Sequence, residues 1–210
     1  FGTYTNFDKF VVSDASASVF SLSLKADADT DMADLRTIDL SGDTNTTGSN
    51  VVDLSLVSGA YTVTGSAGVD TVTGSIGVDY IDVSAASNDI IVIAAATGTG
   101  VSATGATSTS TATLDVYKVE AGDKVNVTGI VATDASFDDL MTISESGNIG
   151  LTVTATYAAQ ARGIYDGDAN TFTHATVAGG ANAVMVSVAA TDSGTTATDS
   201  FVLFGVTTVT

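Results

Sequence analysis

Two consecutive nonapeptides decide the fold of this chain: Gly65-Ser-Ala-Gly68-Val-Asp70-Thr-Val-Thr and Gly74-Ser-Ile-Gly77-Val-Asp79-Tyr-Ile-Asp. Each copy has glycine at positions one and four, aspartate at position six and an aliphatic residue at position eight. A degenerate third copy runs from Ser84 to Val92, with Ser87 in place of the second glycine and Asp89 at position six. Glycine permits a tight turn, and the aliphatic residue begins a strand and fills a core.

Short apolar triplets recur around these copies, from about residue 38 to residue 95, at a spacing of nine to ten residues. Strands this short and this regularly spaced suit a solenoid, in which each coil pairs with the next. Beyond residue 113, longer runs alternate with period two, which predicts strands with one buried face. We therefore predict an all-β fold: a parallel β-roll or β-helix segment with glycine-aspartate turns, continued or flanked by a β-sandwich-like C-terminal region.

Three regions follow from these patterns. Residues 1–40 form an N-terminal β or irregular segment, with a candidate helix at Asp29–Arg36. Residues 41–100 form the solenoid, and residues 101–210 form a C-terminal β region. The boundary lies near Thr97–Thr113, which carries no charge. A second short helix is expected at Ser136–Met141.

Composition restricts the function. Six Lys and Arg residues face 24 Asp and Glu residues, giving a formal net charge of −18, which repels nucleic acid phosphates. There is no cysteine, and no apolar run is long enough to span a membrane. So many carboxylates favour divalent cations that take oxygen ligands, above all calcium.

The glycine-aspartate turns are the candidate calcium sites, because a turn can aim backbone carbonyls inward while one aspartate supplies charge. One full coil contains two nonapeptides, so Asp70 and Asp89 are expected on the same side and Asp79 on the opposite side. A metal-free solenoid that uses Gly and Asp only for tight turns is the alternative. The predicted calcium ligands are Gly65, Gly68, Asp70, Gly74, Gly77, Asp79, Ser87 and Asp89.

These turns resemble the RTX nonapeptide repeats of bacterial proteins exported by type I secretion, with Ser66 and Ser75 where the RTX pattern has its second glycine. The resemblance implies a calcium-bound β-roll and an extracellular, cell-surface location. The segment from Asp199 to Thr210 is similar to the C-terminal strands near which such proteins carry their secretion signal. The composition, rich in Thr, Ser, Ala, Gly and Asp, resembles the C-terminal part of surface-layer proteins of this secretion class.

Other candidate sites are weaker. Asp27-x-Asp29-x-Asp31 has the opening spacing of an EF-hand, but Met32 replaces the required glycine, which leaves an acidic loop or an irregular calcium site. Asp166-Gly-Asp168 is expected to form an ordinary turn. His174 has no catalytic context and is expected at the surface or in a strand. No catalytic residues are predicted, so an enzyme is not expected.

These observations predict a calcium-binding structural protein of the bacterial surface that self-assembles into a lattice or filament. Its expected partners are other copies of itself, with a cell-surface polysaccharide as a further candidate. Two alternatives are the C-terminal export and folding module of a larger secreted RTX enzyme, and an adhesin module that binds glycans through calcium.

Overall fold

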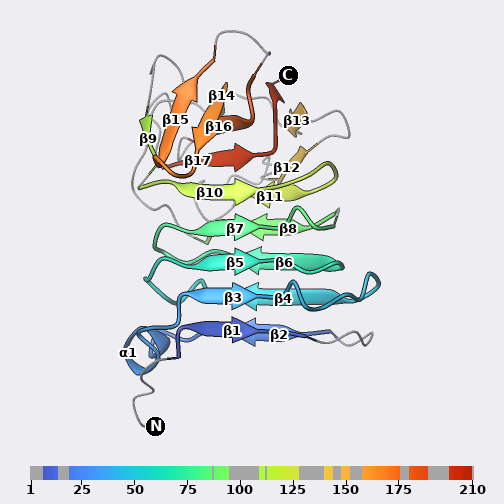
Figure 1. Cartoon of the computed structure of the whole chain (residues 1–210), viewed down its shortest axis with the longest axis vertical. Helices are drawn as coiled ribbons and strands as arrows, with labels where there is room; N and C mark the ends of the chain where they lie inside the picture. The colour runs from blue at the N-terminus through green and yellow to red at the C-terminus, as the bar shows by residue number, and fades with distance from the viewer. Residues whose placement is uncertain are drawn as a thin grey trace, which may run out of the picture.

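The computed structural model describes residues 7–13, 19–86, 88–94, 109–111, 113–127, 140–143, 148–151, 158–175, 180–188 and 199–209. They form two sheets that run the length of the molecule (Figure 1). Sheet A contains, in spatial order, β1 (Lys9–Val11), β3 (Thr37–Asp39), β5 (Thr62–Thr64), β7 (Tyr80–Asp82), β10 (Asp115–Lys118), β17 (Asp199–Phe204), β16 (Ala183–Val188), β14 (Ala158–Asp166), β15 (Thr171–His174) and β9 (Thr109–Ser110). Sheet B contains β18 (Thr208–Val209), β13 (Asn148–Leu151), β12 (Leu140–Ile143), β11 (Lys124–Asn126), β8 (Ile90–Val92), β6 (Val69–Thr73), β4 (Ser49–Asp53) and β2 (Ser21–Ser23).

Successive strands of the N-terminal part alternate between the two sheets, so that one strand from each sheet makes one coil. The chain passes from β3 to β4, then through β5 and β6 to β7 and β8, and each strand pairs in parallel with the corresponding strand of the next coil. Most of these strands have three residues, of which only the central one is buried. The core between the sheets is therefore a stack of aliphatic layers, represented by Ile38, Val63, Ile81, Val52, Val72 and Ile91.

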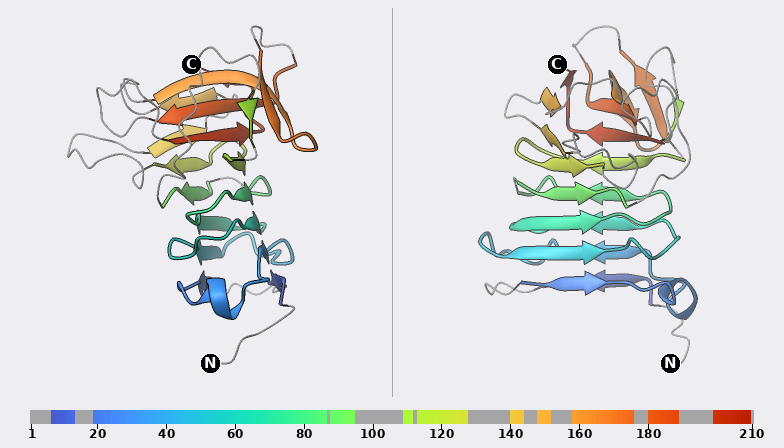
Figure 2. Two further views of the ribbon diagram at one scale, coloured as in Figure 1. Left: turned by 90° about the vertical axis from the view of Figure 1, so that its left-hand side faces the viewer. Right: turned by 180° about the vertical axis from the view of Figure 1, so that it is seen from behind.

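The C-terminal strands extend the same two sheets but change the direction of pairing. In sheet A, β17 pairs in parallel with β10, whereas β16, β14, β15 and β9 follow in antiparallel order. In sheet B, β12 pairs antiparallel with both β11 and β13. Figure 2 shows these strands gathered at the end of the molecule opposite the N-terminus. The β14–β15 hairpin covers a second hydrophobic cluster, which includes Leu114, Val116, Phe172 and Val202.

The fold class predicted from the sequence is therefore wrong as stated. The chain is not purely β, because helix α1 (Ala28–Asp31) is present. The C-terminal strands do not form a β-sandwich-like region but enlarge both sheets, which are mixed and not simply parallel. The period-two pattern marks one buried face, but it does not tell which sheet a strand joins or in which direction it runs.

The two helices expected from the sequence have different outcomes. α1 overlaps the predicted Asp29–Arg36 segment but begins earlier and ends at Asp31. The segment predicted as a helix at Ser136–Met141 ends in strand β12, which contains Leu140 and Met141, and its other residues lie outside the described part. Because α1 is only four residues long, no helix in the described ranges could cross a membrane.

Candidate functional site

The glycines of the nonapeptides are required by close packing between coils. A Cβ atom at Gly68 would lie 2.5 Å from the carbonyl oxygen of Asn45, and one at Gly77 would lie 2.7 Å from that of Ser58. A Cβ at Gly65 would lie 2.7 Å from the carboxylate of Asp70, and one at Gly74 would lie 3.0 Å from that of Asp79. None of the four has a positive φ angle, so close packing between coils, and not a left-handed backbone conformation, requires glycine there.

Buried carboxyl groups form a first column at the start of the sheet B strands. The amide of Asp70 donates to Oδ1 of Asp89 at 2.6 Å, and the amide of Asp89 donates to Oδ1 of Asp123 at 3.1 Å. At the other end of the column, Nδ2 of Asn50 donates to Oδ1 of Asp70 at 3.1 Å. These four side chains are almost completely buried. The predicted stacking of Asp70 on Asp89 is confirmed.

A second column lies at the start of the sheet A strands. The amide of Tyr61 donates to Oδ1 of Asp79 at 2.9 Å, and the amide of Asp79 donates to Oδ1 of Asp115 at 2.7 Å. Oδ2 of Asp115 accepts from the hydroxyl of Tyr117 at 2.8 Å. Asp79 therefore belongs to the other sheet, as the two-nonapeptide coil predicted, and its stacking partner is Asp115.

A serine hydroxyl fills the turn in each of the first two nonapeptides. Ser66 donates its amide to Oδ2 of Asp70 at 2.6 Å, and its hydroxyl lies 3.0 Å from Oδ1 of the same carboxylate and 3.1 Å from the amide of Gly68. Ser75 repeats the arrangement around Asp79. Its amide donates to Oδ2 of Asp79 at 2.6 Å, and its hydroxyl donates to Oδ1 at 2.8 Å. Both carboxylates are thus satisfied by donors of their own turn.

The third turn differs because alanine, not serine, stands at position two. Oδ2 of Asp89 is buried and has no hydrogen-bond partner in the described part of the chain. The neighbouring Asp123 carboxylate accepts from the amide of Glu120 at 2.8 Å as well as from Asp89. Ser87, the predicted ligand of this turn, lies outside the described residues.

Burial dominates the electrostatics of both columns. It raises the pKa of Asp70, and it raises the pKa of Asp79 to about 6. The same cause raises the pKa of Asp115 and of Asp123 to about 7, and that of Asp89 to about 8, with repulsion from neighbouring carboxylates adding to the effect. A proton, a cation or fixed donors must therefore compensate each buried charge.

The described residues of the first two turns do not fit a calcium ion, which takes six to eight oxygen ligands. The oxygens of Asp70 and Asp79 accept from backbone amides and serine hydroxyls, and the described ranges contain no group of three or more His, Cys, Asp or Glu side chains arranged to hold a metal. The third turn offers one unpartnered oxygen, Oδ2 of Asp89. Calcium binding stays a prediction, and the third turn is the one whose described residues leave a carboxylate oxygen without a partner.

Sequence reasoning missed Asn50, Asp115 and Asp123, which complete the two columns. They do not follow the nine-residue spacing, because longer stretches of chain separate them from the three nonapeptide copies. A signal was present, since each of them, like Asp70 and Asp79, stands two residues before a buried strand residue.

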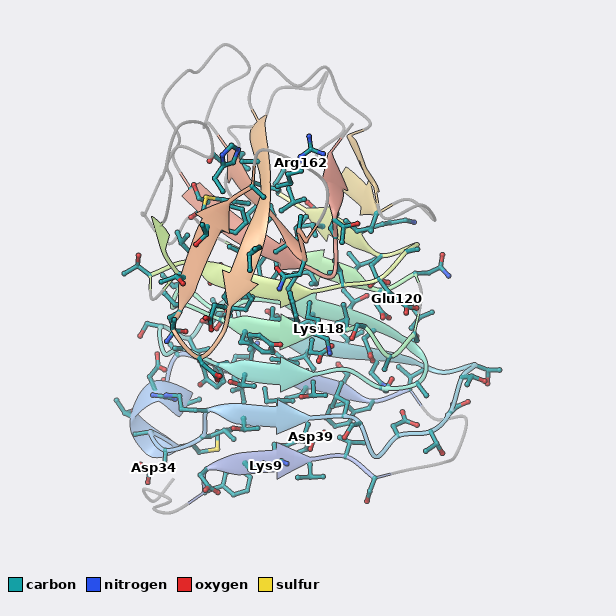
Figure 3. All side chains as sticks on the ribbon, turned by 45° about the horizontal axis from the view of Figure 1, so that its top comes forward. Lys9, Asp34, Asp39, Lys118, Glu120 and Arg162 are labelled. Carbon is teal, nitrogen blue, oxygen red and sulfur yellow. The ribbon has the colours of Figure 1, made fainter. Side chains whose placement is uncertain are left out.

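The remaining candidates behave as ordinary structure. The carboxylate of Asp29 accepts from the amide and hydroxyl of Ser58 at 2.7 and 2.9 Å, which ties α1 to the turn before β5. Oδ1 of Asp166 accepts from two amides of its own turn, as expected for a simple turn. His174 is exposed at the end of β15. In the described part of the chain, the ion pairs Lys9–Asp39 and Lys118–Asp82 bridge strands of sheet A. Figure 3 labels Lys9, Asp39 and Lys118.

Comparison with known proteins adds no relative: no family model, curated protein or solved structure matches this chain.

Proposed function

We propose that this chain is a structural protein of the bacterial surface that assembles with other copies of itself through the open end of its coil stack. The observation that carries the proposal is the pair of edge strands, β1 and β2, at the end of sheet A and sheet B respectively. Both edges lie on the same coil, at the lower end of the molecule in Figure 1.

The backbone of these two strands supports pairing with a further strand. In β1 the backbone carbonyl of Asp8 and the backbone amide of Val12 face β3. The amide of Thr37 donates to the Asp8 carbonyl, and the amide of Val12 donates to the Asp39 carbonyl. Successive residues of a strand point their amides to opposite sides, so those of Lys9 and Val11 face the open edge. In β2 Phe20 and Leu24 face β4 in the same way, which leaves Ser21 and Ser23 at the open edge. Among the residues that the structure describes, no strand pairs with these outer edges, and an unpaired edge is a template for another chain.

The described residues also leave the core incompletely covered at this end. Phe10 and Phe20 stack with ring centroids 5.5 Å apart, and both are only partly buried, as are Val12, Leu22 and Met32. Val11 is 55% exposed and Val19 is 63% exposed. Covering these side chains with another copy would add about 25 cal/mol for each Å² of apolar surface removed from water.

The opposite ends of the two sheets are β9 and β18. Contact between unlike ends of successive molecules generates an open filament, as opposed to a closed dimer. The net charge of −18 opposes such contact through long-range repulsion, which salt screens. Assembly is therefore expected to strengthen as ionic strength rises.

Proline substitutions at the open edge test the proposal. Val11→Pro and Ser21→Pro each remove one amide that faces outward, and neither removes an amide bonded to β3 or β4. The double variant should sediment as a monomer at salt concentrations where the wild type sediments as large species, with its melting temperature maintained. The matched control, Val11→Thr with Ser21→Thr, keeps both amides and should assemble.

Two results would contradict the proposal. A double proline variant that assembles like the wild type would show that this edge is not the contact. A wild-type chain that stays monomeric at every salt and calcium concentration would favour the export and folding module instead.

A further inference from the structure

A cleft of about 340 Å³ lies on the outer face of sheet A, beside the tip of the β14–β15 hairpin. We call it the tyrosine cleft and define it by six of its lining residues: Arg36, Thr62, Tyr80, Thr111, Tyr165 and Asn170. Figure 3 shows the hairpin standing in front of the sheet that forms the other wall. Its volume lies in the range of small-molecule sites.

The sheet wall of the cleft is a ladder of side chains in register. Thr37 pairs with Thr62, Thr62 with Tyr80, and Tyr80 with Val116, on four neighbouring strands. Neighbouring strands are about 4.8 Å apart, so this wall offers repeated hydroxyl groups followed by an aromatic ring. It is rigid, because each member belongs to a paired strand.

The hairpin wall is fixed by packing and hydrogen bonds. The ring of Tyr165 packs edge-to-face on Phe204 at a centroid distance of 5.6 Å. The Asn182 side chain binds both backbone groups of Tyr165. Its Oδ1 accepts from the Tyr165 amide at 2.7 Å, and its Nδ2 donates to the Tyr165 carbonyl at 3.0 Å. The two half-buried tyrosines therefore offer preformed amphipathic surfaces to a ligand.

Polar groups with unused capacity line the same cleft. The hydroxyl of Thr111 is buried and has no hydrogen-bond partner in the described ranges. Arg36 lies 5.3 Å from the centre of the Tyr61 ring and uses Nη1 to donate to Leu35 O and to the Tyr61 hydroxyl, but a guanidinium carries five donor hydrogens. No ion pair joins Arg36 to a carboxylate in the described part of the chain.

The charge of the molecule restricts the ligand class. The net charge of −18 repels polyanions. Among the described residues that line the cleft, however, the only carboxyl group is that of Asp79, which is 2% exposed. A neutral ligand that combines apolar faces with many hydroxyl groups matches tyrosine rings, threonine hydroxyls and a guanidinium. We propose that the tyrosine cleft binds a neutral saccharide, without calcium.

Titration calorimetry in the presence of a chelator tests this site with four probes: cellotetraose, maltotetraose, mannotetraose and N-acetylchitotetraose. At least one should bind with a dissociation constant of about 1 mM or below. Thr62→Trp places an indole in the cleft and should weaken that binding about tenfold or more. Thr64→Trp is the matched control, because it lies on the same strand and face but outside the cleft lining, and should bind like the wild type.

A third variant, Tyr80→Leu, keeps an apolar side chain but removes the aromatic face, and should also weaken binding. The proposal fails if none of the four probes binds, if Thr62→Trp and Thr64→Trp bind equally well, or if a probe binds only in a parallel titration with calcium and no chelator. Neither Val11 nor Ser21 lines the cleft, so the double proline variant should leave saccharide binding unchanged, and this test is independent of the proposed assembly.

Discussion

The amide of Asp70 donates a 2.6 Å hydrogen bond to the carboxylate of Asp89, 19 residues further along the chain. The distance in sequence is that of one coil, so each aspartate ties its own turn to the next coil. Both partners are buried, so losing this bond would leave a polar group unsatisfied in the core, which is costly. Each position-six aspartate therefore acts first as a connector between coils.

The serine that fills each turn should contribute measurably to stability. Ser66→Ala removes a buried hydroxyl that contacts Asp70, Gly68 and Asn50, and leaves part of their hydrogen-bonding capacity unsatisfied. We expect a loss of about 1–3 kcal/mol in the free energy of unfolding by urea. Ser41→Ala is the control, because Ser41 is exposed, and its effect should stay within about 0.5 kcal/mol. Equal effects would refute the role of the filled turn.

Close packing around the glycine at position four of each nonapeptide predicts that any side chain there lowers the free energy of unfolding. Gly77→Ala would place a Cβ 2.7 Å from backbone atoms of Ser58 and Gly59 in the neighbouring coil, so the backbone must shift. We expect destabilisation by about 1–3 kcal/mol, measured by thermal unfolding. At Gly167 the nearest atom would be 3.5 Å away, in ordinary contact, and Gly167→Ala should be nearly neutral. A neutral Gly77→Ala would contradict the observed packing.

The second column predicts that stability falls as pH rises. Asp115 ionises near pH 4 in the unfolded chain, but burial raises its folded pKa to about 7, and the nearby carboxylates of Asp79 and Asp199 oppose ionisation further. Between these values the folded state holds the extra proton. Its stabilising effect is complete below pH 4 and is lost as pH rises through 7.

Urea unfolding from pH 4 to pH 8, with a chelator present, measures this effect. Asp115→Asn keeps an oxygen to accept from the Asp79 amide and should flatten the pH dependence, with the remaining slope contributed by Asp79, Asp89 and Asp123. A wild-type stability that rises with pH over this range would contradict the assignment.

Calcium, if it acts through the third turn, should act through Asp89 only. Calcium at a hundred times its dissociation constant would raise the free energy of unfolding by about 2.7 kcal/mol. The corresponding rise in melting temperature should disappear in Asp89→Asn and persist in Ser75→Ala, whose turn has no unpartnered carboxylate oxygen. No rise in the wild type, or the same rise in Asp89→Asn, would end the calcium prediction.

The coil pattern could be read from the sequence because it is local. Nine residues fix a turn and a short strand, so the nonapeptides were sufficient to predict that Asp70 stacks on Asp89. The partner of Asp79 could not be found this way, since Asp115 follows 36 residues later. Only the pairing of β7 with β10 brings them together.

The C-terminal strands illustrate a different limit. The sequence predicts one buried face for the strands beyond residue 113, but every residue of Ala183–Val188 is buried, because a hairpin covers the outer face of sheet A there. That cover comes from Phe172 and its neighbours, and no local pattern predicts which face a hairpin will cover. The tyrosine cleft arises at this junction, so the sequence alone could not reveal it.

The most direct test of the central claim is amide hydrogen exchange in the peptide that contains β1. In assembled wild-type protein the amides of Lys9 and Val11 should exchange much more slowly than in dispersed protein, because a strand of another copy covers them. Protection of the amide of Val12, which already donates to Asp39, should change little. Assemblies in which Lys9 and Val11 exchange as fast as in the monomer would contradict assembly through this edge.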